Sequence, residues 1–202
     1  MTLPTFTAAR RKASDITHVE VRVFIDYDPQ TGAMYWKPRE LQHFAGDARS
    51  ADIAQRKWNT RFAGKPALNS LSNGYLTGHL NYVQVYAHRI AWMHYYGADV
   101  DTGMYLDHAN GCRTDNRIEN LRLVTPLQSA FNLPPRGTYS THKGVKFDAR
   151  RGHWYARIRV DGVDRSLGRF PDEETAAEAY RKAAAEHQGE HAYHLSRKEI
   201  ET

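Results

Sequence analysis

Residues 107–125 read DHANGCRTDNRIENLRLVT, and the residue types change along this stretch in a way that predicts four successive segments. Residues 104–108 form a short strand that ends in an Asp-His pair and leads into a polar loop. Residues 121–124 form a second strand. Thr125 is a good helix N-cap and Pro126 a good first helical residue, so a helix is predicted over about residues 126–132. The order predicts a ββα unit over residues 104–132, with the first strand and the helix facing each other across a small cavity.

The Asp-His pair carries side chains suited to hydrolysis of a phosphodiester. That reaction needs a base to activate water and a cation to stabilise the leaving oxygen, both held rigidly. His108 can be neutral near pH 7 and accept a proton, and Asp107 offers the hard oxygen ligands that magnesium prefers. Adjacent strand residues point to opposite faces, so the two side chains converge only where the strand ends or is distorted.

The ordered motif resembles the HNH homing-type endonucleases common in phages. Their core reads roughly Asp-His-x-Asn-Gly, then Asp-Asn-Arg, then Asn-Leu-Arg, and this chain has those residues at 107–111, 115–117 and 120–122. The resemblance covers residues 20–132 and implies an α+β protein with the ββα-metal (HNH, or His-Me finger) fold. The matching upstream segments are residues 27–32 (YDPQTG), 36–37 (WK), 64–65 (GK) and 87–92 (AHRIAW).

The resemblance implies a role for each matching site residue. His108 would be the general base, Asp107 a metal ligand, and Asn120 the asparagine that braces the loop. Nine residues after that asparagine the family has a histidine or asparagine as second metal ligand, whereas this chain has Ser129. Three alternatives stay open: Asn132, one helical turn later, takes the place; a water bridges from Ser129; or the site binds metal poorly and cuts slowly.

The segment before the motif is predicted to be a β-rich extension over about residues 20–96. Residues 21–27 and 33–36 are rich in β-forming residues around a Pro/Gly turn and predict a hairpin. Residues 39–62 are either a helix or an extended insertion. Short strands are predicted at 74–80 and 83–86, and a helix over 87–96 that ends at Gly97. His88 and Arg89 in that helix are expected to be structural or near a phosphate rather than catalytic.

A second domain is predicted after a linker at residues 133–141, where two prolines and a glycine lie in a polar run. Residues 144–147, 154–160 and 165–167 alternate like three short strands, and residues 171–189 carry an amphipathic helix. A small antiparallel sheet of three strands packed on one helix is therefore expected over residues 142–195. The first domain would then span residues 1–132.

The second domain resembles the plant ethylene-response-factor (AP-two) DNA-binding domain. The resemblance is carried by residues 142–147 (HKGVKF), 154–160 (WYARIRV), 166–170 (SLGRF) and 175–180 (TAAEAY). It implies a sheet that lies in the major groove of DNA with the helix behind it. Strand alternation independently puts Trp154, Ala156 and Ile158 on the face toward the helix. The predicted DNA contacts are Lys143, Lys146, Arg150, Arg151, Tyr155, Arg157, Arg159 and Arg165, of which Arg157 and Arg159 reach base edges or phosphates and the lysines, Arg150 and Arg151 position the backbone.

Charge and composition agree with an anionic partner. The net charge is +5, and nine basic but only three acidic residues fall between positions 136 and 170. No apolar run approaches the ~20 residues that span a bilayer, and no secretory signal is recognised. The single cysteine, Cys112, forms no internal disulfide. These features favour the cytoplasm, that of the host if the protein is encoded by a phage.

The sequence thus predicts an endonuclease that cuts double-stranded DNA with one divalent ion, Mg²⁺ or alternatively Mn²⁺, acting as a monomer or homodimer. One active site per chain would nick one strand. The alternative is a DNA-binding regulator or architectural protein with a weakened or inactive HNH site, which Ser129 keeps open. A nuclease directed at RNA is a third interpretation.

Overall fold

The computed structural model describes residues 12–101, 103–135 and 140–193. The chain divides into two compact units. The first comprises residues 1–108 and 112–123, and the second comprises residues 109–111 and 124–202. No helix in the described ranges is both long and apolar enough to cross a bilayer.

The first unit begins with a short helix where a strand was predicted. The helix α1 (His18–Phe24) includes residues 21–24, which were predicted to begin the β-hairpin, so that part of the prediction is wrong. Thr17 caps the helix, because its hydroxyl accepts a hydrogen bond from the Glu20 amide. Alternating β-branched residues favoured a strand, but the helix buries Val21 and Phe24, three residues apart, on one face. A short 3₁₀ turn (η1, Ala13–Asp15) precedes α1, and the first strand of the hairpin follows it directly.

The predicted hairpin itself is confirmed. The strands β1 (Ile25–Tyr27) and β2 (Met34–Trp36) pair antiparallel. A second sheet contains β3 (Ser70–Ser72), β4 (Tyr75–Leu80) and β5 (Val83–Tyr86) in that order. The strand β3 was not predicted, whereas β4, β5 and the helix α3 (Ala87–Tyr96), which ends at Gly97, follow the sequence pattern.

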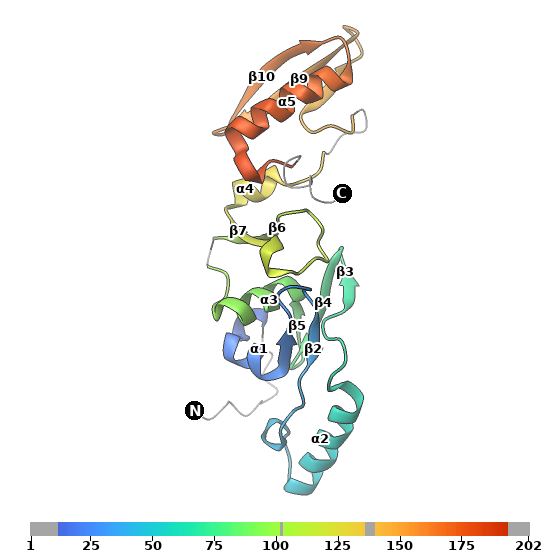
Figure 1. The fold of residues 1–202 in the computed structure, drawn as a ribbon, viewed down its shortest axis with the longest axis vertical. Coiled ribbons are helices and arrows are strands. Elements are labelled where there is room, and N and C mark those ends of the chain that lie inside the picture. Colours follow the sequence, from blue (N-terminus) through green and yellow to red (C-terminus); the bar gives the residue numbers. More distant parts are fainter. Residues whose placement is uncertain (1–11, 102, 136–139, 194–202) are drawn as a thin grey trace. The chain divides into compact units, whose positions relative to one another are not determined.

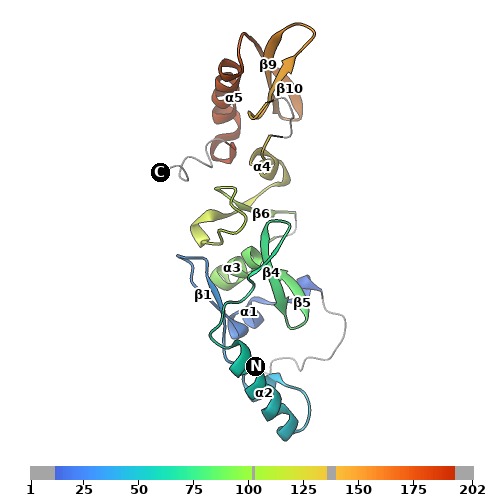
Figure 2. The same cartoon turned by 90° about the vertical axis from the view of Figure 1, so that its right-hand side faces the viewer.

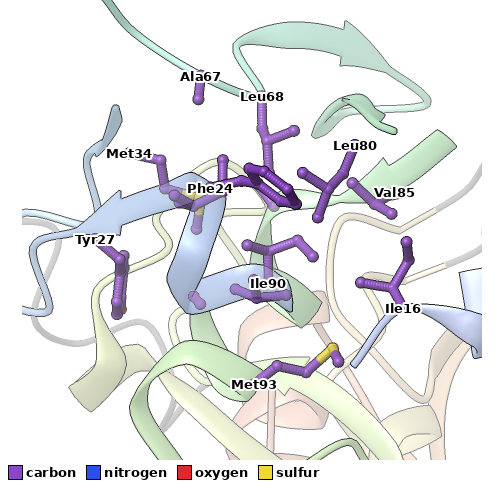
Figure 3. Packing of buried hydrophobic residues seen from close by; sticks show 14 of the residues in the cluster. Ile16, Phe24, Tyr27, Met34, Ala67, Leu68, Leu80, Val85, Ile90 and Met93 are labelled. Carbon is purple, nitrogen blue, oxygen red and sulfur yellow. The ribbon is translucent and has the colours of Figure 1, made fainter. Parts of the chain in front are cut away.

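The core of the first unit forms where α1, α3 and the three-stranded sheet meet. In Figure 1, α1 lies beside α3, and the two helices are in contact. Phe24 occupies the centre of the cluster, with Leu68, Leu80 and Ile90 around it (Figure 3). This packing fixes the hairpin and the sheet relative to the strand that follows α3.

Residues 39–62, left open between a helix and an insertion, form the short 3₁₀ turn η2 (Leu41–His43) and the helix α2 (Ala48–Phe62). Ala51 is the one buried residue of α2, so the helix is largely solvated. In Figures 1 and 2 it extends from one end of the first unit. It contributes little to the core.

The motif segment forms the elements that the sequence predicted. The strand β6 (Tyr105–His108) pairs with β7 (Leu121–Val124), and the 3₁₀ turn η3 (Ile118–Asn120) precedes β7. The helix α4 (Pro126–Phe131) starts at Thr125 with a reciprocal cap, in which Thr125 and Gln128 each accept a hydrogen bond from the other's backbone amide. Contacts place α4 in the second unit.

The second unit is built around an antiparallel sheet of order β10-β9-β8. The strands are β8 (Val145–Asp148), β9 (His153–Val160) and β10 (Val163–Phe170), the last longer than predicted. The helix α5 (Glu173–Gln188) covers one face (Figure 2), and η4 (Gly189–His191) follows it. Its predicted apolar stripe is buried against Ala156 and Ile158 of β9, which confirms the predicted inner face. The stripe consists of Ala176, Ala177, Tyr180, Ala183 and Ala184.

The predicted domain boundaries stay predictions. The linker at 133–141 includes residues 136–139, and the two outer limits, at residues 1 and 195, also fall outside the described ranges.

Candidate active site

His108 is the last residue of β6 and lies buried in the first unit, with 3% of its surface exposed. Its Nε2 is 3.2 Å from Oδ1 of Asn116, a buried residue of the following loop. An amide oxygen only accepts hydrogen bonds, so Nε2 carries the proton of the neutral ring and Nδ1 keeps its lone pair. The loop therefore selects the tautomer in which Nδ1 is the basic nitrogen.

Burial lowers the pKa of His108 below the usual 6.5. The hydrogen bond to Asn116 and the carboxylates of Asp107 and Asp115 oppose that shift, whereas the Arg113 cation adds to it. The net direction keeps the imidazole neutral at physiological pH. A neutral imidazole with one fixed tautomer is the form that accepts a proton from water.

The loop that carries Asn116 is fastened to the β1–β2 hairpin. The Tyr27 hydroxyl donates a 2.8 Å hydrogen bond to the Asn116 carbonyl, and the Ile118 amide donates to the Pro29 carbonyl at 3.0 Å. Gly32 has a φ of 75°, and a Cβ there would lie 2.8 Å from backbone atoms of the loop, so glycine is required. Asn116 was not among the predicted site residues, since only the folded path of the loop brings it to His108.

Asn120 is buried at the end of η3, and its Nδ2 donates a 2.8 Å hydrogen bond to the Asp115 carbonyl. The Asp115 carboxylate accepts from Arg117, at 2.9 Å from Nε and 2.8 Å from Nη2. Arg117 Nη1 also pairs with Glu119 at 2.7 Å. These contacts hold the loop in a closed conformation. Asn120 thereby supports Asp115, and Asn116, the next residue, contacts His108.

Asp107 lies next to His108 and forms an ion pair with Arg122 of β7. Its Oδ2 is 3.2 Å from Nη2 and 3.3 Å from Nε of that arginine, and both side chains are largely buried. Within the described ranges no three His, Cys, Asp or Glu residues are grouped to hold a metal ion. A fit to a metal therefore rests on one carboxylate supplemented by amide, hydroxyl or water oxygens. That donor chemistry suits Mg²⁺, which keeps several of its waters, although the guanidinium offsets part of the carboxylate charge.

The two candidates for the second ligand belong to α4 and its C-cap. Ser129 is half-buried, whereas Asn132 is buried and its backbone amide donates to the Ser129 carbonyl at 3.2 Å. They lie in the second unit, whereas Asp107 lies in the first. Lys143 closes the end of α4, because its Nζ donates to three carbonyl oxygens. These belong to Ala130, Phe131 and Leu133, at 3.0, 2.6 and 2.9 Å.

The rings of His88 and Tyr75 pack against His108. The His88 ring centroid is 5.2 Å from that of His108, and the Tyr75 centroid is 5.2 Å from His88 and 5.9 Å from His108. Burial, with a contribution from His108, lowers the pKa of His88 to about 3. His88 is therefore neutral at physiological pH, and its ring packs edge-on against the imidazole of His108. Its expected structural role is consistent with this position.

The outer face of the C-terminal sheet carries a shallow groove of about 560 Å³. Four of the predicted DNA contacts line it, namely Arg151, Tyr155, Arg157 and Arg165. Lys146 pairs with Tyr155 across the strands, and Arg159 extends the row beyond Arg157, so both belong to the same face. Arg150 is exposed at the β8–β9 turn. Lys143, also a predicted DNA contact, instead donates its hydrogen bonds to carbonyl oxygens at the end of α4.

Two further features of this face were not predicted. Arg169 also lines the groove, opposite Tyr155 in the register. Asp164 lies on the same face, with its carboxylate oxygens 4.0 Å from the guanidinium groups of Arg157 and Arg159. The longer β10 explains why both escaped the sequence pattern, which placed only residues 165–167 in that strand.

Part of the chain is similar in sequence to known proteins. A family model described as HNH endonuclease matches residues 85–130. The "Uncharacterized HNH endonuclease L560" of Acanthamoeba polyphaga mimivirus is 28% identical over 140 residues, which are 69% of this chain and 67% of that protein. "Protein 3.8" of Escherichia phage T7 is 28% identical over 64 residues, covering 31% of this chain and about half, 53%, of the phage protein. No solved structure matches.

The matched segment begins in β5 and ends in α4, so it contains the Asp-His pair, the bracing loop and the start of the capped helix. It also contains the buried His108 and its 3.2 Å partner Asn116. Residues 85–130 of the chain are therefore similar to the HNH endonuclease family.

Proposed function

We propose that the protein is a metal-dependent DNA endonuclease in which His108 is the general base and the C-terminal sheet anchors the enzyme on duplex DNA. The observation that carries this proposal is the buried imidazole of His108, held by Asn116 with Nδ1 as its basic nitrogen. A histidine held in this way is prepared to remove one proton from water.

The reaction is hydrolysis of a phosphodiester bond. Nδ1 of His108 accepts a proton from water while the water oxygen forms a bond to phosphorus, and the bond from phosphorus to the 3′ oxygen breaks. Asn116 keeps the ring in position and stabilises the imidazolium that forms, because its Oδ1 accepts the hydrogen bond from Nε2 in both protonation states. The ring cluster of Tyr75 and His88 limits access of bulk water on one side.

Asp107 would hold one divalent ion, together with Ser129 or Asn132, and the bound ion would stabilise negative charge on the leaving oxygen. Arg122 pairs with the Asp107 carboxylate at 3.2 Å and orients it. We propose Mg²⁺ as the ion, with Mn²⁺ as the alternative. With one such site per chain, each encounter nicks one strand, and a double-strand break needs a homodimer or two encounters.

The exposed basic face supports the proposed role of the second unit, which we take to be AP-two-like. Arg157 and Arg159 are exposed, so they can reach base edges or phosphates in the major groove. Lys146, Arg150 and Arg151 would contact the backbone and fix the register. A homing or related function in a phage-infected cell, in the host cytoplasm, fits the viral origin of the two similar proteins.

A plasmid cleavage assay tests the proposal. The wild-type chain is incubated with supercoiled plasmid and Mg²⁺, Mn²⁺ or Zn²⁺, and compared with His108→Ala and with the control His79→Ala, an exposed histidine of β4. We expect wild type and His79→Ala to nick the plasmid, and His108→Ala to lose at least about a hundredfold in rate. Equal rates for wild type and His108→Ala would refute the proposal.

A second candidate function, a DNA-binding regulator with an inactive nuclease site, is favoured by two observations. Ser129 stands where the family has an amide or imidazole ligand, and Arg122 neutralises part of the Asp107 charge. Ser129→Asn separates the two functions. If wild type binds DNA without cutting it and Ser129→Asn cuts, the regulator is the correct function for this chain. If wild type already cuts, it is not.

A further inference from the structure

Arg113 lies in the polar loop after His108 and is exposed. Its guanidinium carbon is 4.8 Å from the centroid of the Tyr75 ring, a geometry of cation–π contact. The same ring is 5.9 Å from the His108 ring. Arg113 is therefore held beside the candidate general base by an aromatic platform from a distant part of the chain.

The β3–β4 hairpin holds this arginine by its turn as well as by Tyr75. Asn73 and Gly74 both have positive φ, 51° and 82°, as a two-residue type I′ turn requires. The Asn73 carbonyl accepts a 3.2 Å hydrogen bond from Nη1 of Arg113. The stem of the arginine passes 3.5 Å from the position that a Cβ on Gly74 would occupy. The side chain thus has a defined course.

Arg113 differs from the other arginines near the site in its charge balance. Arg117 pairs with Asp115, Arg122 with Asp107, and Arg89 with Asp99. Within the described residues, Arg113 forms no ion pair with a carboxylate; its contacts are a carbonyl oxygen and an aromatic ring. Its positive charge and most of its five N–H donors are available for an anion.

We propose that Arg113 is a catalytic residue that binds the scissile phosphate through a pair of its N–H groups and stabilises the charge that builds on the non-bridging oxygens. This inference rests on the proposed endonuclease function and adds a residue to it. The planar fork of a guanidinium matches two phosphate oxygens, which a lysine ammonium does not. The contact strengthens as the phosphorus becomes five-coordinate, so it lowers the barrier rather than only increasing affinity.

Single-turnover nicking of plasmid by the full chain, with Mg²⁺ and increasing enzyme, separates the rate constant from the half-saturating concentration. The variants are Arg113→Gln, Arg113→Lys and the control Arg56→Gln, which removes a cation from the distant helix α2. We expect Arg113→Gln to lower the saturated rate constant about 100-fold or more, as the loss of one oxyanion donor does. Arg113→Lys should recover part of the loss but stay about tenfold below wild type, and Arg56→Gln should stay within about twofold.

Two outcomes would overturn the inference. If Arg113→Gln has the wild-type rate constant, the residue does not act in the reaction. If only the half-saturating enzyme concentration changes, Arg113 is a contact to the DNA backbone that contributes to affinity alone. If Arg113→Gln fails to fold, as judged by circular dichroism, Arg113→Lys decides: a wild-type rate constant in that variant refutes the bidentate contact. Failure of the proposed function looks different, because wild type and His108→Ala would then have equal activity.

Discussion

Replacing Asn116 tests whether the loop controls both the tautomer and the pKa of His108. Asn116→Leu keeps much of the side-chain volume but removes the acceptor of the 3.2 Å hydrogen bond. A buried hydrogen bond contributes about 0.5–1.5 kcal/mol net, and 1.4 kcal/mol is a factor of ten in population. We therefore expect up to about tenfold fewer molecules with Nδ1 correctly presented, and a rate constant up to about tenfold lower. The unpaired Nε2–H also costs about 1–3 kcal/mol of stability.

The pKa of His108 should move in opposite directions in two Asn116 variants. The Asn116 hydrogen bond raises that pKa, so Asn116→Leu lowers it further. Asn116→Asp keeps an acceptor and adds a negative charge, which favours the imidazolium and raises the pKa. His108 acts only when neutral, so its activity falls as the pH drops through its pKa. The acid limb of the rate profile should therefore lie at lower pH than wild type in Asn116→Leu and at higher pH in Asn116→Asp.

Single-turnover nicking across about pH 5 to pH 9 measures both quantities, because the rate constant at the plateau and the midpoint of the acid limb are fitted together. Thermal unfolding of each variant identifies any loss that comes from unfolded protein. Acid limbs that coincide in wild type and both variants would refute the role of Asn116 in setting the base. A shift of the same sign in both variants would do so as well.

Three further predictions concern stability. Burial lowers the pKa of His88 from 6.5 to about 3, so between these pH values the unfolded chain binds one more proton than the folded chain. The free energy of unfolding should therefore be greatest above pH 6.5 and fall by up to about 1.4 kcal/mol per pH unit on acidification. Urea unfolding of His88→Gln at several pH values should show a weaker dependence of that free energy on pH. Lys143→Met removes three hydrogen bonds to the end of α4 and should lower the free energy of unfolding of the second unit by about 2 kcal/mol, whereas the exposed Lys146→Met should change it by less than about 0.5 kcal/mol. Gly144→Ala places a Cβ 2.2 Å from the Tyr180 ring at a φ of 74° and should lower the free energy of unfolding by more than about 3 kcal/mol. Gly152→Ala has a φ of 67° but open space around the Cβ, so it should lower that free energy by about 1 kcal/mol. Calorimetry of both variants measures the difference.

The elements that were predicted correctly are those whose signals are local. The Gly97 end of α3 and the Thr125 cap of α4 are each specified by a few adjacent residues. The inner face of β9 follows from alternation alone, since Ala156 and Ile158 are buried and Arg157 between them is exposed. Such features depend little on the rest of the chain, so sequence patterns suffice for them.

The helix α1 shows where local preference is overruled. Val21, Val23 and Ile25 alternate as in a strand, and their branched side chains favour one. The Thr17 cap and the burial of Val21 and Phe24 beside α3 outweigh that preference, because burying two large apolar side chains contributes several times the ~1 kcal/mol span of β-propensity. The competing gain depends on a helix some 70 residues later, and no short pattern contains it.

The candidate site likewise combines features that are local in the sequence with contacts between distant segments. The Asp-His pair was predicted from adjacent residues, but the contacts that give the pair its chemistry come from segments far apart in the chain. Tyr27 holds the carbonyl of Asn116 across 89 residues, and Asn73 holds Arg113 across 40. The first contact positions the residue whose Oδ1 lies 3.2 Å from Nε2 of His108, and the second positions the arginine that we propose binds the phosphate. A sequence motif specifies which groups are present, whereas the two hairpins that reach the loop position Asn116 beside His108 and hold Arg113, the contacts on which the proposed reaction depends.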